Sequence, residues 1–269
     1  MAVWLAGLPA IVADAQDRWQ LTIDSPFEPG GQTAWVAPAQ TRDGRALVLK
    51  VLWRHDESEH EADGLRTWAG NGAVRLIDER SDDDTAVMLL ERAEPGTPLA
   101  TRPEEDQDVV IAAVLPRLWI DPAPGHPFRP LADMCDLWAS SRERRTGHPH
   151  EDAGLVRTGV ELFRALPRDA GRAVLLATDL HAQNVLAAER EPWLVIDPKP
   201  YIGDPTYDAL QHLLNCPARL HADPCALVDR MAGLLDLDAQ RLRLWLFARC
   251  IVDDHWDPPL ADVAHELAP

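Results

Sequence analysis

The stretch LLATDLHAQNVLAAEREPWLVIDPKP, residues 175–200, decides the fold. Two apolar runs each end in an aspartate, Asp179 and Asp197, and the loop between them contains His181 and Asn184. Buried strands rarely end in acid for packing reasons alone, because a buried carboxylate without a partner is costly. The stretch therefore indicates a chemical site.

Asp179 and Asn184 stand in the spacing D-x-x-x-x-N, and Asp197 ends the β-type run PWLVIDP. Their carboxylate and amide oxygens are hard ligands, which suit Mg²⁺ better than a transition metal. Phosphoryl transfer needs one carboxylate to orient a hydroxyl, and an amide with a second carboxylate to hold the metal. The spacing matches the catalytic loop of protein kinases, but by itself it is weak because many surface loops contain it by chance.

A lysine upstream strengthens this interpretation. The chain has 24 arginines and two lysines, and Lys50 lies in the middle of the apolar strand ALVLKVLW. Nucleotide phosphates together with a helix glutamate would satisfy such a lysine. The alternative is a lysine that points to solvent from a half-exposed strand. Glu61, on the helix predicted from ESEHEADGLRTWAG, is the best pairing acid, and Glu57, one turn earlier on the same face, is its competitor.

The first third of the chain is predicted to form a small antiparallel sheet with one helix. Residues 33–38 and 45–52 are expected to pair as a hairpin, because Asp43-Gly44 suits a tight turn in which both central residues have positive φ. The runs AVRLIDE and TAVMLLE predict two more strands.

A Pro/Gly-rich connection near residues 92–98 opens a long helix from 103 to 119, and most of the later chain has helical patterns. The expected helices cover residues 130–145, 152–166, 207–216, 224–235 and 239–254, followed by a short tail. We therefore expect an α+β chain with two lobes: a β-rich nucleotide-binding lobe over residues 1–92, and a helical lobe over 93–269 with the catalytic loop and the substrate site.

The order of these motifs resembles the aminoglycoside phosphotransferases, and within them the streptomycin 6-phosphotransferase and hydroxyurea phosphotransferase group. It is carried by strand Lys50, helix Glu61, LLERAEPGTPL, TDLHAQNVL and VIDPKPYIGDPTYDALQHLLNC, and IDPKPYIGDPTYD is the most specific part. The resemblance runs along nearly the whole chain. It implies a bilobal protein-kinase-like fold, ATP and Mg²⁺ as cofactors, and transfer of the γ-phosphate to a hydroxyl of a small, often cationic antibiotic, which would confer resistance.

The resemblance also implies roles for single residues. Asp179 would be the catalytic base, Asn184 and Asp197 the magnesium ligands, Lys50 the phosphate contact and Glu61 its partner.

Three further residues receive supporting roles. Asp208 would be a structural acid that holds the catalytic loop, and Asp204 would share that role. His181 is expected to brace the loop and not to do chemistry, because Asp179 already supplies a general base.

The sequence departs from the family pattern in two places. Ala177-Thr178 stand where the family usually has His-Gly, so the reaction would be slower or the loop supported differently. A full glycine loop is also missing, and PGGQTAWV is the expected phosphate cover, with Gly30 and Gly31 letting backbone amides approach.

The formal net charge of −18 argues against nucleic acid or an anionic membrane as partner. It favours a cationic ligand, although acidity also simply keeps a protein in solution. Asp253 and Asp254 are candidates to contact substrate ammonium groups, with Trp256 as a stacking face. The alternative is a solvated helix end.

The N-terminus has no basic region and turns acidic early, which predicts an amphipathic helix and not a signal peptide. With no apolar run approaching the roughly 20 residues of a membrane span, we expect a cytoplasmic protein. The four cysteines show no CxxC and are expected to be reduced. A zinc site made of His212, Cys216, His221 and Cys225 is the competing interpretation, but packing explains the first two equally well.

The leading hypothesis is therefore an ATP-dependent kinase that acts on a hydroxyl of an aminocyclitol such as streptomycin. The second is a kinase of the same fold that acts on hydroxyurea or another small alcohol, because the residues that select substrates lie in variable helices. The third is a nucleotide-binding protein without turnover, suggested by the missing His-Gly.

Overall fold

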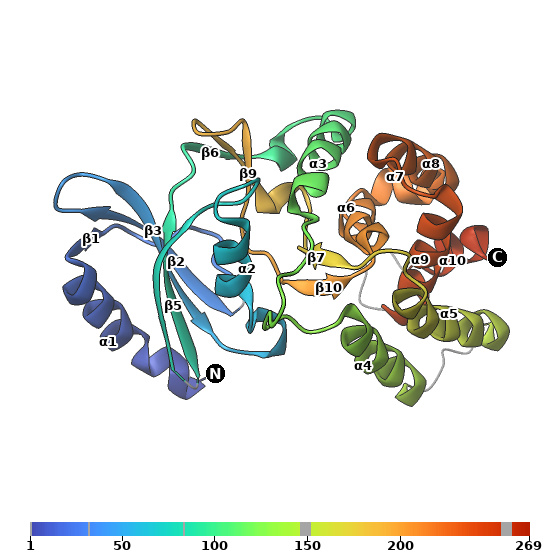
Figure 1. Ribbon diagram of the computed structural model, residues 1–269, viewed down its shortest axis with the longest axis horizontal. Helices are drawn as coiled ribbons and strands as arrows, with labels where there is room; N and C mark the ends of the chain where they lie inside the picture. Colours follow the sequence, from blue (N-terminus) through green and yellow to red (C-terminus); the bar gives the residue numbers. More distant parts are fainter. Residues whose placement is uncertain (1, 32, 83, 146–151, 254–259) are drawn as a thin grey trace. The chain divides into compact units, whose positions relative to one another are not determined.

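The computed structural model describes residues 2–31, 33–82, 84–145, 152–253 and 260–269 (Figure 1). The chain divides into two compact units. The first contains the chain up to Thr97 together with Leu186–Lys199, and the second contains Pro98–Val185 together with Pro200–Pro269. The first boundary, between Thr97 and Pro98, lies in the Pro/Gly-rich connection near residues 92–98, and the first unit also takes in a later segment of the chain.

An antiparallel sheet of five strands, in the order β1-β2-β3-β5-β4, forms the body of the first unit. The strands are β1 (Leu21–Ile23), β2 (Ala34–Thr41), β3 (Ala46–Trp53), β4 (Leu76–Ser81) and β5 (Thr85–Glu91). The predicted hairpin of β2 and β3 is confirmed. Its turn differs from the prediction, because Gly44 has a φ of 86° whereas Asp43 is not among the residues with positive φ. The connection is therefore a longer loop that needs one left-handed residue.

Two helices lie on opposite faces of this sheet, α1 (Ala2–Trp19) and α2 (Glu61–Trp68) (Figure 1). Leu47, Leu49 and Val51 of β3 belong to the core that packs against α1. Because successive side chains of a strand point to opposite faces, Lys50 faces away from α1, toward the side of α2.

The later segment joins the first unit through a second sheet of three strands. β6 (Pro95–Pro98), β8 (Val185–Ala188) and β9 (Trp193–Val195) have the order β6-β8-β9. Val74 donates its N–H to the carbonyl of Val195 at 3.0 Å. Arg190, in the turn between β8 and β9, holds both carboxylate oxygens of Glu91 at 2.7 and 2.9 Å. These contacts fix the chain just before Asp197.

The second unit is mainly helical, so the α+β prediction is confirmed. Its helices are α3 (Glu104–Leu118), α4 (Leu131–Arg144), α5 (Ala153–Ala165), α6 (Leu210–Leu214), α7 (Pro217–Ala222), α8 (Pro224–Leu235), α9 (Ala239–Val252) and α10 (Ala261–Leu267). A short antiparallel pair, β7 (Val174–Leu176) and β10 (Tyr201–Gly203), accompanies them. The helix predicted over 207–216 begins instead as a 3₁₀ turn, Pro205–Ala209, because Asp204 caps the backbone N–H of Thr206.

Aromatic side chains form the centre of the second unit. The ring of Trp245 meets Phe163 at 5.9 Å and Tyr207 at 5.1 Å, both nearly perpendicular. On α5, Gly159 lies so close to Ile251 that a Cβ atom there would be 2.6 Å away. Among the described residues, the helices are too short or too polar to cross a membrane.

Candidate active site

A buried ion pair joins β3 to α2 in the first unit. The Nζ of Lys50 lies 2.6 Å from Oε1 and 2.7 Å from Oε2 of Glu61, and the two side chains are 6% and 3% exposed. Glu61 is the first residue of α2, where the helix dipole favours a negative charge. Glu61, the acid that the sequence favoured as the partner, is in contact with Lys50.

Asp197 completes this cluster from the end of the segment that follows β9. Its Oδ1 lies 2.7 Å from the Nζ of Lys50, and its side chain is 45% exposed. The backbone of Asp197 is left-handed, with a φ of 52°, a conformation that Asp tolerates better than most residues. One lysine therefore faces two carboxylates, one buried and one open to solvent.

The charges of this cluster are strongly coupled. Although burial disfavours a charged ammonium, Glu61 and Asp197 together raise the pKa of Lys50 above its usual range. Burial raises the pKa of Glu61 to about 7, against the attraction of Lys50. Lys50 is therefore held in its charged form by its two carboxylate neighbours.

Glu57 and the two glycines differ from their sequence description. Glu57 lies in a separate 3₁₀ turn, Asp56–Ser58, and not one turn earlier on α2. The turn forms because the hydroxyl of Ser58 accepts from the N–H and donates to the carbonyl of His55.

Gly30 and Gly31 lie between β1 and β2, neither with a left-handed φ, and a Cβ atom on Gly30 would meet nothing within 4 Å. Backbone strain thus does not require glycine there, and their contact with phosphate stays a prediction.

The catalytic-loop candidates lie in the second unit, directly after β7. Asp208 is fully buried and holds this loop by its backbone, because its carboxylate accepts from the N–H of Ala177 at 3.0 Å and of Thr178 at 2.7 Å. The indole Nε1 of Trp119 donates to the same carboxylate at 3.0 Å. Burial raises the pKa of Asp208 to about 6, although all three donors favour its ionised form.

Thr178, directly before Asp179, is left-handed with a φ of 50°. This conformation is unfavourable for a branched side chain. Four other described residues besides glycines have a positive φ. One is Asp197, and the other three lie at or next to the ends of helices: Gln20, Ala69 and Asp236. A glycine at the position of Thr178, which the sequence resemblance leads one to expect, fits this backbone without strain.

Asn184 closes the loop that Asp179 opens. Its Nδ2 donates to the carbonyl of Asp179 at 3.0 Å, and its own N–H donates to the carbonyl of His181 at 2.9 Å. The side-chain amide is thereby oriented, and Oδ1 is the atom with which it can ligate a cation. His181 braces the loop through its backbone.

Asp204 and Asp253 both contact arginines of α9. The carboxylate of Asp204 accepts from Arg241 at 2.6 Å and from the indole of Trp245 at 2.7 Å. Asp253 is ion-paired with Arg249 and its side chain is 14% exposed. Arg249 thus already pairs with Asp253, one of the three residues predicted to contact the substrate. The other two, Asp254 and Trp256, lie outside the described residues.

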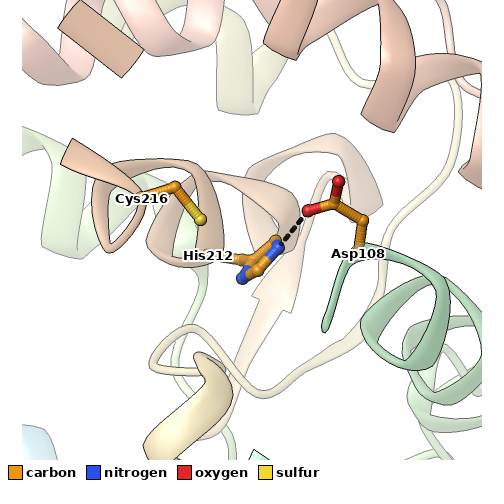
Figure 2. A group of neighbouring side chains, drawn as sticks. All are labelled: Asp108, His212 and Cys216. Atoms are coloured by element: carbon orange, nitrogen blue, oxygen red, sulfur yellow. Dashed lines mark hydrogen bonds and ion pairs between the residues drawn. The ribbon is translucent and has the colours of Figure 1, made fainter. Parts of the chain in front are cut away.

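A buried group in the second unit brings together Asp108, His212 and Cys216 (Figure 2). Figure 2 shows His212 directed at Asp108, with Nε2 and Oδ1 at 2.8 Å. Of the four residues weighed for zinc, this group contains His212 and Cys216, with Asp108 as the third member in place of His221 and Cys225.

The donor set of this group does not fit a metal ion. The carboxylate of Asp108 also accepts two bonds from Arg219, at 3.1 and 2.8 Å, and one from Arg230 at 2.6 Å. Two guanidinium groups repel a further cation, and they already occupy the carboxylate of Asp108 together with His212. The group is a charge network that links α3 to α6, α7 and α8.

Sequence reasoning missed two features of the site. Trp119 lies far from the loop in sequence, and no local pattern connects its indole to Asp208. The Asp108 network likewise joins helices that are distant in the chain. The signal for Lys50 was present, because a lone lysine in an apolar strand demands a partner.

Comparison with known proteins assigns the chain to a family. The family model of the aminoglycoside/hydroxyurea antibiotic resistance kinases matches residues 18–258. The chain belongs to this kinase family. The streptomycin 6-kinase of Streptomyces griseus is 37% identical over 264 residues, which are 94% of this chain and 84% of the relative. The hydroxyurea phosphotransferase of Kitasatospora aureofaciens is 35% identical over 266 residues, 97% of this chain and 76% of the relative.

Solved structures support the kinase fold that the sequence resemblance implied. An aminoglycoside phosphotransferase of Streptomyces rimosus, solved with ADP and streptomycin, has a TM-score of 0.60 at 18% identity and covers 92% of this chain and 99% of its own. A choline kinase of Streptococcus pneumoniae has a TM-score of 0.62 at 12% identity and covers 97% of both chains. The resemblance and the fold class are confirmed: this chain is a small-molecule kinase of the aminoglycoside/hydroxyurea resistance family.

Proposed function

We propose that this kinase transfers the γ-phosphate of ATP, with Mg²⁺, to a hydroxyl of an aminocyclitol antibiotic of the streptomycin class. The observation that carries the proposal is the cluster of Lys50, Glu61 and Asp197, together with 37% identity to a streptomycin 6-kinase. Phosphoryl transfer is mostly positioning and electrostatic stabilisation, which is the chemistry that these side chains supply.

In the first unit, Lys50 binds phosphate oxygens of ATP. Glu61 fixes the ammonium with two short contacts, so the lysine loses little further freedom when nucleotide binds. The sheet adds an apolar wall, because Val36 and Met88 pair with Lys50 across β2 and β5 and therefore share its face.

In the second unit, Asp179 orients the acceptor hydroxyl and takes its proton as the bond to phosphorus forms. Asp208 and Asn184 hold the backbone on both sides of Asp179. The missing His-Gly therefore does not leave the loop unsupported, which favours turnover over the hypothesis of a binding protein without activity.

Each unit offers one side chain whose chemistry suits a magnesium ion. The carboxylate of Asp197 is 45% exposed and the amide of Asn184 is oriented by its bond to Asp179, and both are hard oxygen ligands. When bound, Mg²⁺ would neutralise charge on the phosphates.

The substrate class follows from charge and from the relatives. A net charge of −18 attracts a polycationic acceptor and repels an anionic one. The acids expected to contact substrate ammonium groups stay Asp253, which is also paired with Arg249, and Asp254, with Trp256 as the stacking surface.

A second candidate is phosphorylation of hydroxyurea, which the 35% identity to a hydroxyurea phosphotransferase supports. Hydroxyurea is small and uncharged, so the acidity of the chain would not assist its binding.

Release of ADP from Mg-ATP, measured across streptomycin, other aminoglycosides, hydroxyurea and simple sugars, tests these proposals. We expect ADP release that depends on streptomycin. Release with hydroxyurea alone selects the second candidate, and tight ATP binding without turnover on any acceptor contradicts both.

A further inference from the structure

The chain uses lysine at two of its 26 basic positions and arginine at all the others. One of the two lysines is Lys50, in the buried cluster with Glu61 and Asp197. The other is Lys199, two residues after Asp197. Both lysines therefore lie in the first unit, whereas every other basic position outside the histidines is an arginine.

The geometry places Lys199 beside this cluster. The Oδ1 of Asp197 lies 2.7 Å from the Nζ of Lys50, and the Cα atom of Lys199 is at most about 7 Å from the Cα atom of Asp197, because two residues span no more than that. Lys199 is half-buried and lies in the same compact unit as Lys50. Its charge reaches the buried carboxylate of Glu61, where it contributes to lowering the pKa.

The charges explain why a second lysine is needed. Lys50 alone faces two carboxylates, so these three side chains carry a net negative charge when no metal ion is bound, and a further cation beside them favours the phosphates of ATP. Lys199 brings the four side chains to neutrality. An ammonium is a compact point charge with three donors, which suits the oxygens of a terminal phosphate, whereas the planar fork of arginine suits fixed bidentate partners.

We propose that Lys199 is a second phosphate-binding residue, which contacts the γ-phosphate of ATP while Lys50 holds the phosphates nearer the nucleoside. This inference rests on the proposed kinase function. Lys199 forms no bond in the reaction: the γ-phosphorus passes from the oxygen of the β-phosphate to the acceptor oxygen, and the ammonium neutralises charge on its peripheral oxygens.

The test compares binding of a diphosphate and a triphosphate, which needs no acceptor. Dissociation constants of Mg-ADP and of Mg with a non-hydrolysable ATP analogue are measured by calorimetry for wild type, Lys199→Met, Lys199→Gln and Lys199→Arg. A charge-assisted contact to the γ-phosphate makes the Met and Gln variants lose about tenfold or more in affinity for the triphosphate. ADP affinity is expected to stay nearly unchanged, and the Arg variant is expected to recover part of the loss.

Arg80→Met is the matched control, because Arg80 is a basic residue of the same unit whose ion pair with Asp14 lies outside the cluster. If the Met and Gln variants lose equal affinity for ADP and the triphosphate, or lose no affinity but have a lowered melting temperature, Lys199 is a structural partner of Glu61. Either result overturns the inference. Wild-type protein that binds neither nucleotide refutes the kinase function itself, a result distinct from failure of the Lys199 variants alone.

Discussion

Trp119 and Asp208 lie 89 residues apart in the chain, and the indole Nε1 of Trp119 donates to the Oδ2 of Asp208 at 3.0 Å. The same carboxylate holds the backbone of Ala177 and Thr178. This is the position where the sequence departs from its family, with Ala-Thr in place of His-Gly. The loop before Asp179 is therefore supported by a carboxylate and an indole.

The first prediction concerns pH. Burial raises the pKa of Asp208 to about 6, and the loop needs the ionised form because all three partners are donors. We expect kcat/KM to fall as the pH drops through about 6. Trp119→Phe removes one donor, which raises the pKa of Asp208 further, so the acid limb of the profile moves to higher pH. Trp138→Phe, at a tryptophan that stacks on Phe163, should leave the limb in place, and an unmoved limb in Trp119→Phe refutes this role.

The same ionisation has the opposite effect on stability. Burial in the folded protein raises the pKa of Asp208 from its ordinary value of 3.8 to about 6. Its contribution to the free energy of unfolding is therefore fully present below pH 4 and is lost as pH rises through 6, with a size on the order of 3 kcal/mol. The free energies of unfolding of wild type and Asp208→Asn, measured with denaturant between pH 4 and 8, give this contribution as their difference. If the difference between the two free energies of unfolding does not change with pH, the raised pKa of Asp208 is contradicted.

The second prediction concerns Thr178, whose φ of 50° is unfavourable for a branched residue. Thr178→Gly relieves this strain, so we expect the free energy of unfolding to rise by about 1 kcal/mol. Activity should be retained, because Asp208 binds the backbone N–H and not the side chain. Ala69→Gly, at the left-handed end of α2, is the matched comparison, because it relieves the same kind of backbone strain at a residue outside the catalytic loop. Loss of activity in Thr178→Gly would show that the threonine side chain itself has a function.

The third prediction separates a charge network from a metal site at Asp108. Asp108→Asn leaves His212, Arg219 and Arg230 without their shared anion, and we expect a loss of about 3–5 kcal/mol in the free energy of unfolding. A strong chelator should leave the melting temperature of the wild type unchanged. A melting temperature that falls with the chelator and returns with added zinc would restore the metal interpretation.

The fourth prediction concerns the pair of Lys50 and Glu61. Lys50→Met strands a buried carboxylate and should cost about 3–5 kcal/mol of stability. The double variant Lys50→Met with Glu61→Gln should recover much of that stability while nucleotide affinity stays low. Calorimetric binding and thermal unfolding of both variants make the comparison. Nucleotide affinity that returns with stability would mean that Lys50 has no direct contact with phosphate.

Local patterns predicted the parts of this fold that depend on short-range chemistry. The β2–β3 hairpin and the approach of Glu61 to Lys50 follow from strand alternation and from an apolar lysine's need for a partner. Residues 207–216 show where local patterns fail, because Asp204 and Pro205 impose a 3₁₀ turn on a sequence with helical spacing.

Contacts over long sequence separation could not be predicted. Nothing local to Leu186–Lys199 indicates that this segment belongs to the first unit, since its placement depends on strand pairing with β6 and on the bond of Arg190 to Glu91. The partners of Asp208 and Asp108 come from helices elsewhere in the chain. The two-lysine count was visible in the sequence, but its meaning for Lys199 depends on the cluster around Lys50.

The most direct test of the central claim follows the labelled γ-phosphate of Mg-ATP into streptomycin. Wild type, Asp179→Asn and the control Asp121→Asn, which changes an exposed acid of the same unit, are compared by chromatography of the acceptor. We predict labelled streptomycin with wild type and with Asp121→Asn, and a reduction of at least about 100-fold with Asp179→Asn. Label transfer that is undiminished in Asp179→Asn would contradict the mechanism.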